Sequence, residues 1–214
     1  MSFASLEGKR ALVTGASKGI GRAIAEELVR AGAEVVVGYR TGAEEAEALA
    51  REIEGRAVRA DVSNAEEAAR LVEEAGDLDI LVNNAGLTRD GLLARMPDDD
   101  WRTVIETNLS SVFYTCRAVC RPMMKKRAGS IVNISSIVGV HGNWGQTNYA
   151  ASKAVISAAP ESPASRLDHV DSTSSPSGVT APSPVTTTRL RPLREPLSEV
   201  TTFQVRRRRA ARPL

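Results

Sequence analysis

The chain has 214 residues and a formal net charge of +2; 42% of its residues are hydrophobic and 25% are charged. This length suits one domain or slightly more, and the apolar content is sufficient for a globular core. No run approaches the ~18 apolar residues of a membrane-spanning helix, and no charged-then-apolar leader precedes residue 9. We therefore expect neither a membrane protein nor a secreted one, and we expect a cytoplasmic location.

The first elements of the chain are a short strand, a glycine-rich turn and a helix. Residues 10–14 read as an apolar strand, and apolar residues recur at helical spacing over 20–31. Glycines at the spacing G-x-x-x-G-x-G let the turn approach a pyrophosphate, which N–H groups at the helix N-terminus bind. An ordinary strand–helix turn is the alternative, but the place in the first strand–helix unit favours a dinucleotide-binding loop. Its members are Gly15, Ser17, Lys18, Gly19, Ile20 and Gly21.

The second predicted strand, residues 34–39, should end beside the ribose of a bound adenosine. Sites that prefer NAD place an acidic residue there, which binds the 2′-hydroxyl. This chain has Arg40 instead, and Lys18 lies in the glycine loop. Two cations without a carboxylate suit a 2′-phosphate, so we predict a preference for NADP(H). The alternative is that both are solvated surface cations.

The alternation of strands and helices continues to residue 135. Further strands are predicted at 56–60, 79–83 and 130–135, and helices at 42–53, 64–75, 98–108 and 110–127. Two of these helices open on capping-box patterns, Thr41–Glu44 and Ser63–Glu66. Helices between strands imply parallel pairing with right-handed crossovers, so the predicted fold class is α/β, a doubly wound, Rossmann-like parallel sheet. Ligands should meet at the carboxyl ends of its strands, where Gly15, Asp61, Asn84 and Ser136 fall.

Cys116 and Cys120 lie one helical turn apart in the predicted helix 110–127. Two thiols cannot complete a zinc site, so we predict no metal site. Buried, reduced cysteines are the better interpretation, and they agree with a cytoplasmic location.

Tyr149 and Lys153 are four residues apart, thirteen residues or more after Ser136. On a helix such residues share one face, so the ammonium would lie beside the phenol. A positive charge beside a phenol favours the phenolate, which makes the phenol usable for proton transfer near neutrality. Taken alone, such a pair is more often a feature of a helix surface than a catalytic site. The other motifs of the chain reverse that judgement.

Several segments, in this order, resemble the classical short-chain dehydrogenase/reductase family. The resemblance covers about residues 6–154, and within the family it is strongest to the 3-oxoacyl-[acyl-carrier-protein] reductases, which reduce keto groups in fatty-acid synthesis. The matching segments are Thr14–Gly21, Asp61–Val62, Asn83–Gly86, Thr88–Asp90, Glu106–Phe113, Ile134–Ser136 and Gly145–Lys153.

The resemblance implies a role for each of four catalytic residues. Tyr149 would protonate the carbonyl oxygen as hydride arrives from the nicotinamide, and Lys153 would bind the nicotinamide ribose. Ser136 would hold the substrate carbonyl by a hydrogen bond, and Asn108 would fix a water that relays protons to Lys153. Preplaced donors of this kind stabilise a developing oxyanion.

The resemblance also implies how NADP(H) is bound. Asp61, followed by Val62, would accept a hydrogen bond from the adenine amino group. The turn formed by Asn84, Ala85 and Gly86 would pack along the ribose. The implied reaction is the NADPH-dependent reduction of a keto group, most simply of a 3-oxoacyl thioester to a 3-hydroxyacyl thioester. The alternative is a catalytically inert, truncated remnant that at most binds a dinucleotide.

After residue 154 the sequence departs from the family. Residues 155–214 hold eight of the ten prolines and nine arginines but no lysine. Pro160 and Pro163 should stop the helix that carries Tyr149, and no apolar strand follows. We therefore predict a truncated reductase domain over residues 1–158 and a disordered tail over 159–214. A shifted reading frame or a decayed gene is our hypothesis for this tail and a genuine extension is the alternative; the sequence of the coding DNA would distinguish them.

A truncated family domain has physical consequences. The missing strands should leave an open sheet edge, which is an aggregation hazard. The resemblance implies that in the family the helix carrying the Tyr–Lys pair continues for several turns and packs at a subunit interface. Its expected early end makes the family's tetramer doubtful here. A helix held by one or two turns should position Tyr149 poorly, so we predict weak or no reductase activity.

Two basic segments bear on partners. Arg127 follows the predicted helix 110–127, where a cation complements the helix dipole; the resemblance implies that it contacts the acidic acyl-carrier protein. Arg206–Arg209 lacks interleaved aromatic residues and lies in the tail, so we expect no nucleic-acid partner and no membrane partner.

Overall fold

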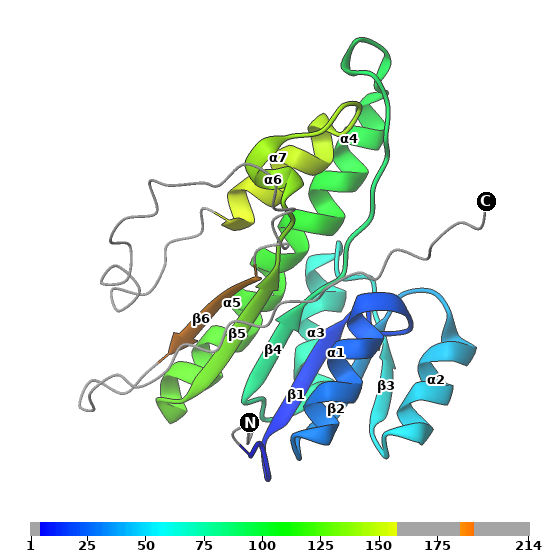
Figure 1. Ribbon diagram of the computed structural model, residues 1–214. Coiled ribbons are helices and arrows are strands. Elements are labelled where there is room, and N and C mark those ends of the chain that lie inside the picture. The colour runs from blue at the N-terminus through cyan, green and yellow to red at the C-terminus, as the bar shows by residue number, and fades with distance from the viewer. Residues whose placement is uncertain (1–4, 158–184, 191–214) are drawn as a thin grey trace, which may run out of the picture.

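The computed structural model describes residues 5–157 and 185–190, and the structural statements below concern these residues (Figure 1). The strands are β1 (Arg10–Thr14), β2 (Glu34–Tyr39), β3 (Arg56–Arg59), β4 (Ile80–Asn83), β5 (Gly129–Ile134) and β6 (Val185–Leu190). The helices are α1 (Gly19–Arg30), α2 (Ala43–Glu52), α3 (Ala65–Ala75), α4 (Asp98–Ile105), α5 (Ser111–Lys126), α6 (Val138–His141) and α7 (Thr147–Ser157).

All the strands form one sheet in the order β3-β2-β1-β4-β5-β6. The first five pair in parallel, and the chain crosses from one side of β1 to the other between β3 and β4. The order 3-2-1-4-5 is that of a Rossmann-like fold, which binds its ligands where the strand order reverses, beside the carboxyl ends of β1 and β4. The predicted α/β, doubly wound parallel sheet is therefore confirmed.

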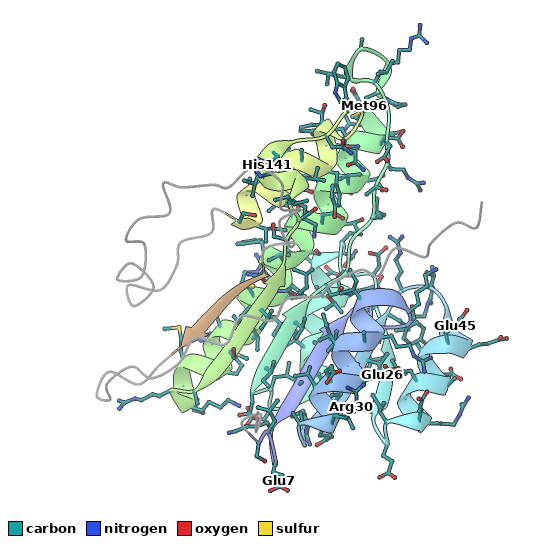
Figure 2. All side chains as sticks on the ribbon, in the orientation of Figure 1. Glu7, Glu26, Arg30, Glu45, Met96 and His141 are labelled. Carbon is teal, nitrogen blue, oxygen red and sulfur yellow. The ribbon has the colours of Figure 1, made fainter. Side chains whose placement is uncertain are left out.

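Helices cover both faces of the sheet (Figure 1). On one face, Val13 of β1 belongs to a buried cluster with Ala25 of α1 and with residues of α2. On the other face, Leu12 packs in a cluster with Leu71 of α3 and with residues of α5. The outer sides of the helices are charged; Arg30 on α1 and Glu45 on α2 are exposed examples (Figure 2). Burial on both faces explains the continuous apolar runs of these strands.

The long helical segment after β4 differs from the prediction. We predicted separate helices at 98–108 and 110–127, but a π-helical turn, Glu106–Ser110, joins α4 to α5 without a break. Thr107 and Asn108 in this turn are buried. Such π-turns recur at functional sites, and a sequence pattern based on 3.6 residues per turn does not reveal them.

Both predicted capping boxes are wrong in their residues. Helix α2 begins after Gly42, which has a positive φ and no side-chain cap, so Thr41 is not its N-cap. Helix α3 begins after Asn64, whose side-chain oxygen accepts two first-turn N–H groups. Ser63 instead donates its hydroxyl to Asp61. Asn and Ser cap equally well, so their order in the sequence does not decide which one does so.

Strand β6 is an element that the sequence analysis did not predict. It pairs antiparallel with β5, from Gly129 opposite Leu190 to Ile134 opposite Val185. Threonine and valine favour strands, and the edge of β5 offers unpaired backbone groups, so pairing there is physically reasonable. The sequence analysis expected no apolar strand in this part of the chain; β6 has the sequence VTTTRL, in which four of six residues are polar, so that expectation is not contradicted. Pro160, Pro163, Arg206–Arg209 and the expected disorder of the remaining tail lie outside the described residues.

Two further expectations concern membranes and metals. Among the described residues, no helix is both long and apolar enough to span a membrane. In the same part of the chain, no three His, Cys, Asp or Glu side chains come together as a metal site. Cys116 and Cys120 are free thiols that are half-buried rather than buried. Burial raises the pKa of the Cys116 thiol to about 11, which makes it a poor nucleophile.

Candidate active site

The glycine-rich turn lies at the carboxyl end of β1 and packs against the loop that follows β4. A Cβ added at Gly15 would lie 2.9 Å from the Cα of Ala85. A Cβ added at Gly21 would lie 2.4 Å from the carbonyl oxygen of Gly15. Gly15 and Gly19 also have positive φ, a conformation that side chains disfavour. The geometry of the turn therefore requires the glycines that the spacing singled out.

Hydrogen bonds from the β4 loop fix this turn. The side-chain amide of Asn84 donates to the carbonyl oxygens of Thr14 (2.9 Å) and Gly15 (3.0 Å). The hydroxyl of Thr14 accepts the backbone N–H groups of Asn84 and Ala85, each at 3.0 Å. Thr14 is buried and was not among the predicted site residues. A hydroxyl at the end of an apolar strand, directly before the first glycine, was the signal that could have found it.

The N-terminus of α1 fits an anion. Its N-cap residue, Lys18, makes no side-chain bond to the first turn, which also has no acidic residue. Nothing lies within 4 Å of a Cβ added at Gly19, so a ligand can approach the backbone there. Ser17 is buried beside this turn, and Lys18 and Ile20 are exposed at its rim. Free N–H groups and the helix dipole both favour phosphate, so these residues fit the pyrophosphate of a dinucleotide.

Arg40 and Asp61, both predicted to meet the adenosine, contact each other. The Nη1 of Arg40 lies 3.4 Å from Oδ2 of Asp61, and both side chains are partly exposed. Burial raises the pKa of the Asp61 carboxyl, but hydrogen bonds from Ser63 and the charge of Arg40 outweigh burial and hold it below its ordinary value. Val62 is buried next to Asp61. Arg40 is therefore already paired, whereas the sequence analysis treated it as a cation without a carboxylate.

Tyr149 and Lys153 are neighbours on α7. Lys153 is only 4% exposed, and its Nζ donates to the carbonyl oxygen of Ile134 at 2.7 Å. The same nitrogen lies 5.8 Å from the centre of the Tyr149 ring. Burial lowers the pKa of Lys153 to about 8. An amine with this pKa is charged at neutral pH yet close to giving up its proton, which suits proton transfer.

The loop after β4, which carries Asn84, Ala85 and Gly86, approaches Lys153 at Gly86. A Cβ added at Gly86 would lie 3.2 Å from Oδ1 of Asn108 and 3.7 Å from Nζ of Lys153. Asn108 is fully buried, and its side-chain amide bonds both the N–H (2.8 Å) and the C=O (2.9 Å) of Leu87. The loop after β4, the π-turn and α7 therefore converge at one place. In this structure the Asn108 side chain holds the loop.

Ser136 follows β5. Its hydroxyl oxygen accepts the N–H of Val138 at 3.2 Å, which leaves its own hydrogen available for a ligand. The preceding Ser135 is buried and was not predicted. Its hydroxyl donates to the carbonyl oxygen of Lys153 at 2.9 Å and lies 2.5 Å from the hydroxyl of Ser157. These contacts join the end of β5 to α7, and no sequence pattern separates them from ordinary serines.

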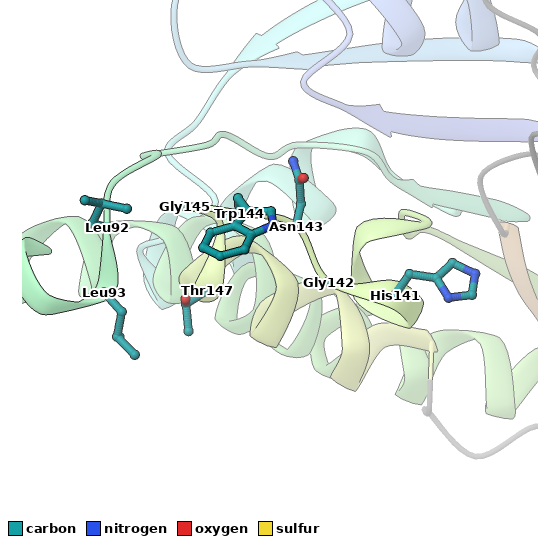
Figure 3. A pocket seen from close by; sticks show the side chains of 8 residues that line it. All are labelled: Leu92, Leu93, His141, Gly142, Asn143, Trp144, Gly145 and Thr147. Carbon is teal, nitrogen blue, oxygen red and sulfur yellow. The ribbon is translucent and has the colours of Figure 1, made fainter.

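An open cavity of about 480 Å³ lies beside the first turn of α7 (Figure 3). Leu92 and Leu93 from the loop after β4 line it together with Trp144, and all three are exposed, Trp144 to 93%. Thr147, two residues before Tyr149, also lines the cavity. Tyr149 itself does not line it. His141, Asn143 and Thr147 add polar groups to the lining, so a surface of mixed polarity lies beside the first turn of α7.

Residues 9–171 match the short chain dehydrogenase family, and the chain belongs to that family. The match extends beyond residue 154, where the resemblance seen in the sequence analysis ended.

The chain is similar to several proteins named 3-oxoacyl-[acyl-carrier-protein] reductase FabG. It is 52% identical to that of Vibrio harveyi over 158 residues, which cover 71% of this chain and 64% of the relative. It is 52% identical to that of Escherichia coli (strain K12) over 156 residues, with 70% and 64% covered. It is 45% identical to that of Staphylococcus aureus (strain Mu50) over 168 residues, with 74% and 68% covered. The chain thus spans slightly less than two thirds of the length of the first two relatives.

Proposed function

We propose that this chain is an NADP(H)-dependent oxidoreductase that reduces the keto group of a 3-oxoacyl thioester to a hydroxyl group. The names of the relatives support the substrate class. The single observation that carries the proposal is the close approach at Gly86, in the loop after β4, where an added Cβ would lie 3.7 Å from Nζ of Lys153. A nicotinamide held by that loop would lie beside the Tyr149–Lys153 pair.

Each catalytic residue has a chemical task in this proposal. Tyr149 gives a proton to the carbonyl oxygen of the substrate, and Ser136 donates its free hydroxyl hydrogen to the same oxygen. Two donors aimed at one oxygen oppose the charge that develops on it. Lys153, protonated below about pH 8, supplies positive charge beside Tyr149 and a donor for the nicotinamide ribose. Asn108 keeps the loop at Leu87 against α7. The nicotinamide, when bound, supplies the hydride.

The proposal assigns the 2′-phosphate of NADP(H) to Lys18 and Arg40. The pair between Arg40 and Asp61 is exposed, and such pairs contribute roughly 0–1 kcal/mol. A phosphate offers more charge and three acceptor oxygens, so it can draw Arg40 away from Asp61. Asp61 is then free to accept the adenine amino group.

We propose an acidic acyl-carrier protein as the partner that presents the substrate. Arg127 is exposed at the C-terminal end of α5, directly after Lys125 and Lys126. A cation in this place complements the helix dipole whether or not a partner binds. Reversal of this charge, Arg127→Glu, should raise KM for a carrier-bound substrate and leave KM for a small thioester unchanged. The predicted cytoplasmic location agrees with this partner, and the predicted loss of the family's tetramer stays a prediction.

The second candidate is an inert remnant that binds a dinucleotide without turnover. The completeness of the glycine turn favours it, because that turn needs no residue beyond Gly86 and could bind a dinucleotide without a working catalytic pair. The division of the chain into a truncated domain, residues 1–158, and a disordered tail, residues 159–214, stays a prediction and is part of this second candidate.

One experiment separates the two candidates. NADPH binding is measured by titration calorimetry on the full chain, and NADPH oxidation is measured with a 3-oxoacyl thioester. Binding with turnover supports the reductase; binding without turnover supports the remnant. A chain that binds neither NADPH nor NADH excludes both.

A further inference from the structure

Helix α7 has a buried polar face directly beside the face that carries Tyr149 and Lys153. Asn148 and Ser152 are both 0% exposed, and each precedes one member of the catalytic pair. Residues four apart lie on one face of a helix, so Asn148 and Ser152 form a face of their own. We propose that Asn148 and Ser152 are positioning residues, which set the rotation and depth at which α7 holds Tyr149 and Lys153. The inference rests on the proposed function.

Asn148 ties the first turn of α7 to two other elements. Its Nδ2 donates to the carbonyl oxygen of Arg89 at 2.9 Å and lies 3.4 Å from that of Asp100. Its Oδ1 accepts the backbone N–H of Tyr149 at 2.7 Å. Arg89 belongs to the loop after β4, and Asp100 to the first turn of α4. The side-chain amide of Asn148 therefore connects the backbone of Tyr149 to the loop after β4 and to helix α4.

Ser152 makes the corresponding connection one turn later. Its hydroxyl donates to the carbonyl oxygen of Tyr149 at 2.8 Å and accepts Nδ2 of Asn108 at 3.2 Å. Asn108 in turn holds Leu87 by two hydrogen bonds. The backbone of Tyr149 is thus bonded on its N–H side through Asn148 and on its C=O side through Ser152. Both chains of bonds end on the loop that carries Gly86.

Polar contacts have unusual weight on this helix. Asn148, Ser152, Lys153 and Ile156 are its buried residues among those described, and only Ile156 is apolar. Gly139 packs closely against the backbone of Lys153 and limits how far α7 can move, and each hydrogen bond to a fixed backbone group narrows the arrangement further. A displacement of ~1 Å at a reacting group can cost ~100-fold in rate. The two side chains should therefore act on turnover more than on binding.

The test uses the full chain with Asn148→Asp and Ser152→Ala. Aspartate has the shape of asparagine but faces the Arg89 and Asp100 carbonyls with an acceptor; alanine removes the Ser152 hydroxyl. Val155→Ala is the matched control, because Val155 lies on the same helix and is 54% exposed. Measurements are NADPH affinity, KM and kcat for a 3-oxoacyl thioester, and the free energy of unfolding. We expect kcat to fall roughly 10–100-fold in both variants with KM and NADPH affinity within about twofold, and no change in the control.

A second readout does not depend on turnover. NMR of ¹³C-labelled lysine follows the titration of Lys153, whose pKa lies at about 8 because it is buried. If Ser152→Ala lets α7 move outward, Lys153 gains solvent and its pKa rises towards 10.5, the ordinary value. This outcome supports the inference even if the chain proves to have no reductase activity. Should either variant lose stability while kcat per folded chain and the Lys153 titration stay unchanged, the residues are merely structural and the inference is wrong.

Discussion

The two halves of the candidate site are held in place by different balances of packing and hydrogen bonding. In the nucleotide-binding half, glycines at positions 15 and 21 bring backbone against backbone with no space for a side chain, and Asn84 adds hydrogen bonds to the carbonyl oxygens of Thr14 and Gly15. In the catalytic half, Gly139 packs as closely against the backbone of Lys153, but three of the four buried residues described on α7 are polar. The place of Tyr149 therefore depends more on individual hydrogen bonds, which reach across 44 to 59 positions of sequence.

This difference predicts how substitutions should divide. A substitution in the glycine turn should lower nucleotide affinity by steric displacement of the backbone. This loss of affinity should be the same at different pH values. A substitution on α7 should change the turnover rate and its dependence on pH, because it removes a hydrogen bond or a charged group.

Removal of the Tyr149 hydroxyl should have the largest effect. In Tyr149→Phe the ring stays and the proton donor is lost, so kcat should fall roughly 10²–10⁴-fold, the usual contribution of a general acid. Tyr114→Phe is the control, because Tyr114 lies on α5 and contacts Arg117. NADPH affinity should be unchanged in both variants. A Tyr149→Phe variant that keeps more than half of the activity would show that this hydroxyl is not the donor.

The buried amine of Lys153 should make stability depend on pH. Its pKa is about 8 in the folded chain against 10.5 ordinarily, so the unfolded chain binds more protons between these values and folding becomes more favourable as pH rises through them. The gain should be about 3 kcal/mol. It is measured as the difference in urea-unfolding free energy between the native chain and Lys153→Met, which lacks the amine, at pH 7.5 and 10.5. If the difference in unfolding free energy were the same at both pH values, the pKa of Lys153 would not differ between the folded and the unfolded chain.

Gly21→Ala should weaken the nucleotide cradle. Its Cβ would lie 2.4 Å from the Gly15 carbonyl oxygen and 2.5 Å from Nδ2 of Asn84. Overpacking of this kind costs roughly 1–3 kcal/mol, and the displaced turn should bind NADPH at least ~10-fold more weakly. Gly91→Ala is the control, because nothing lies within 4 Å of its added Cβ. Calorimetric titration at pH 7 and 8.5 should give the same loss at both values; equal NADPH affinity in the two variants would contradict the steric account.

The smallest expected effect is on the choice of nucleotide. Arg40→Ala should reduce the ratio of NADPH to NADH affinity about tenfold, which corresponds to ~1.4 kcal/mol. Arg51→Ala is the control, because Arg51 is also exposed and lies on the outer helix α2. The two affinities are measured side by side for each variant. An unchanged ratio in Arg40→Ala would leave Arg40 as a surface cation paired with Asp61.

Local patterns predicted the frame of this molecule well. Strands β1 and β2 begin and end where the sequence analysis placed them, because runs such as Glu34–Tyr39 are bounded by polar or glycine residues. The glycine turn could be predicted because glycine is the residue that readily adopts the backbone conformation the turn requires. The spacing of Tyr149 and Lys153 likewise requires only one helix to bring them together.

Features that depend on distant partners were missed. Asn148 and Ser152 read as ordinary helix residues until Arg89, Asp100 and Asn108 are placed around them. The choice of Asn64 over Ser63 as a cap depends on small backbone differences. The pairing of Arg40 with Asp61 joins residues 21 positions apart. In each case the sequence supplies the group, and only the fold supplies its partner.

The central claim is that the glycine cradle and the Tyr149–Lys153 pair act as one site. The most direct test incubates the full chain with NADPH deuterated at the transferable position and a 3-oxoacyl thioester, and analyses the product by mass spectrometry. The account predicts a 3-hydroxyacyl thioester that carries deuterium, and none above background with Tyr149→Phe. NADPH bound at full occupancy with no labelled product from the native chain would contradict it.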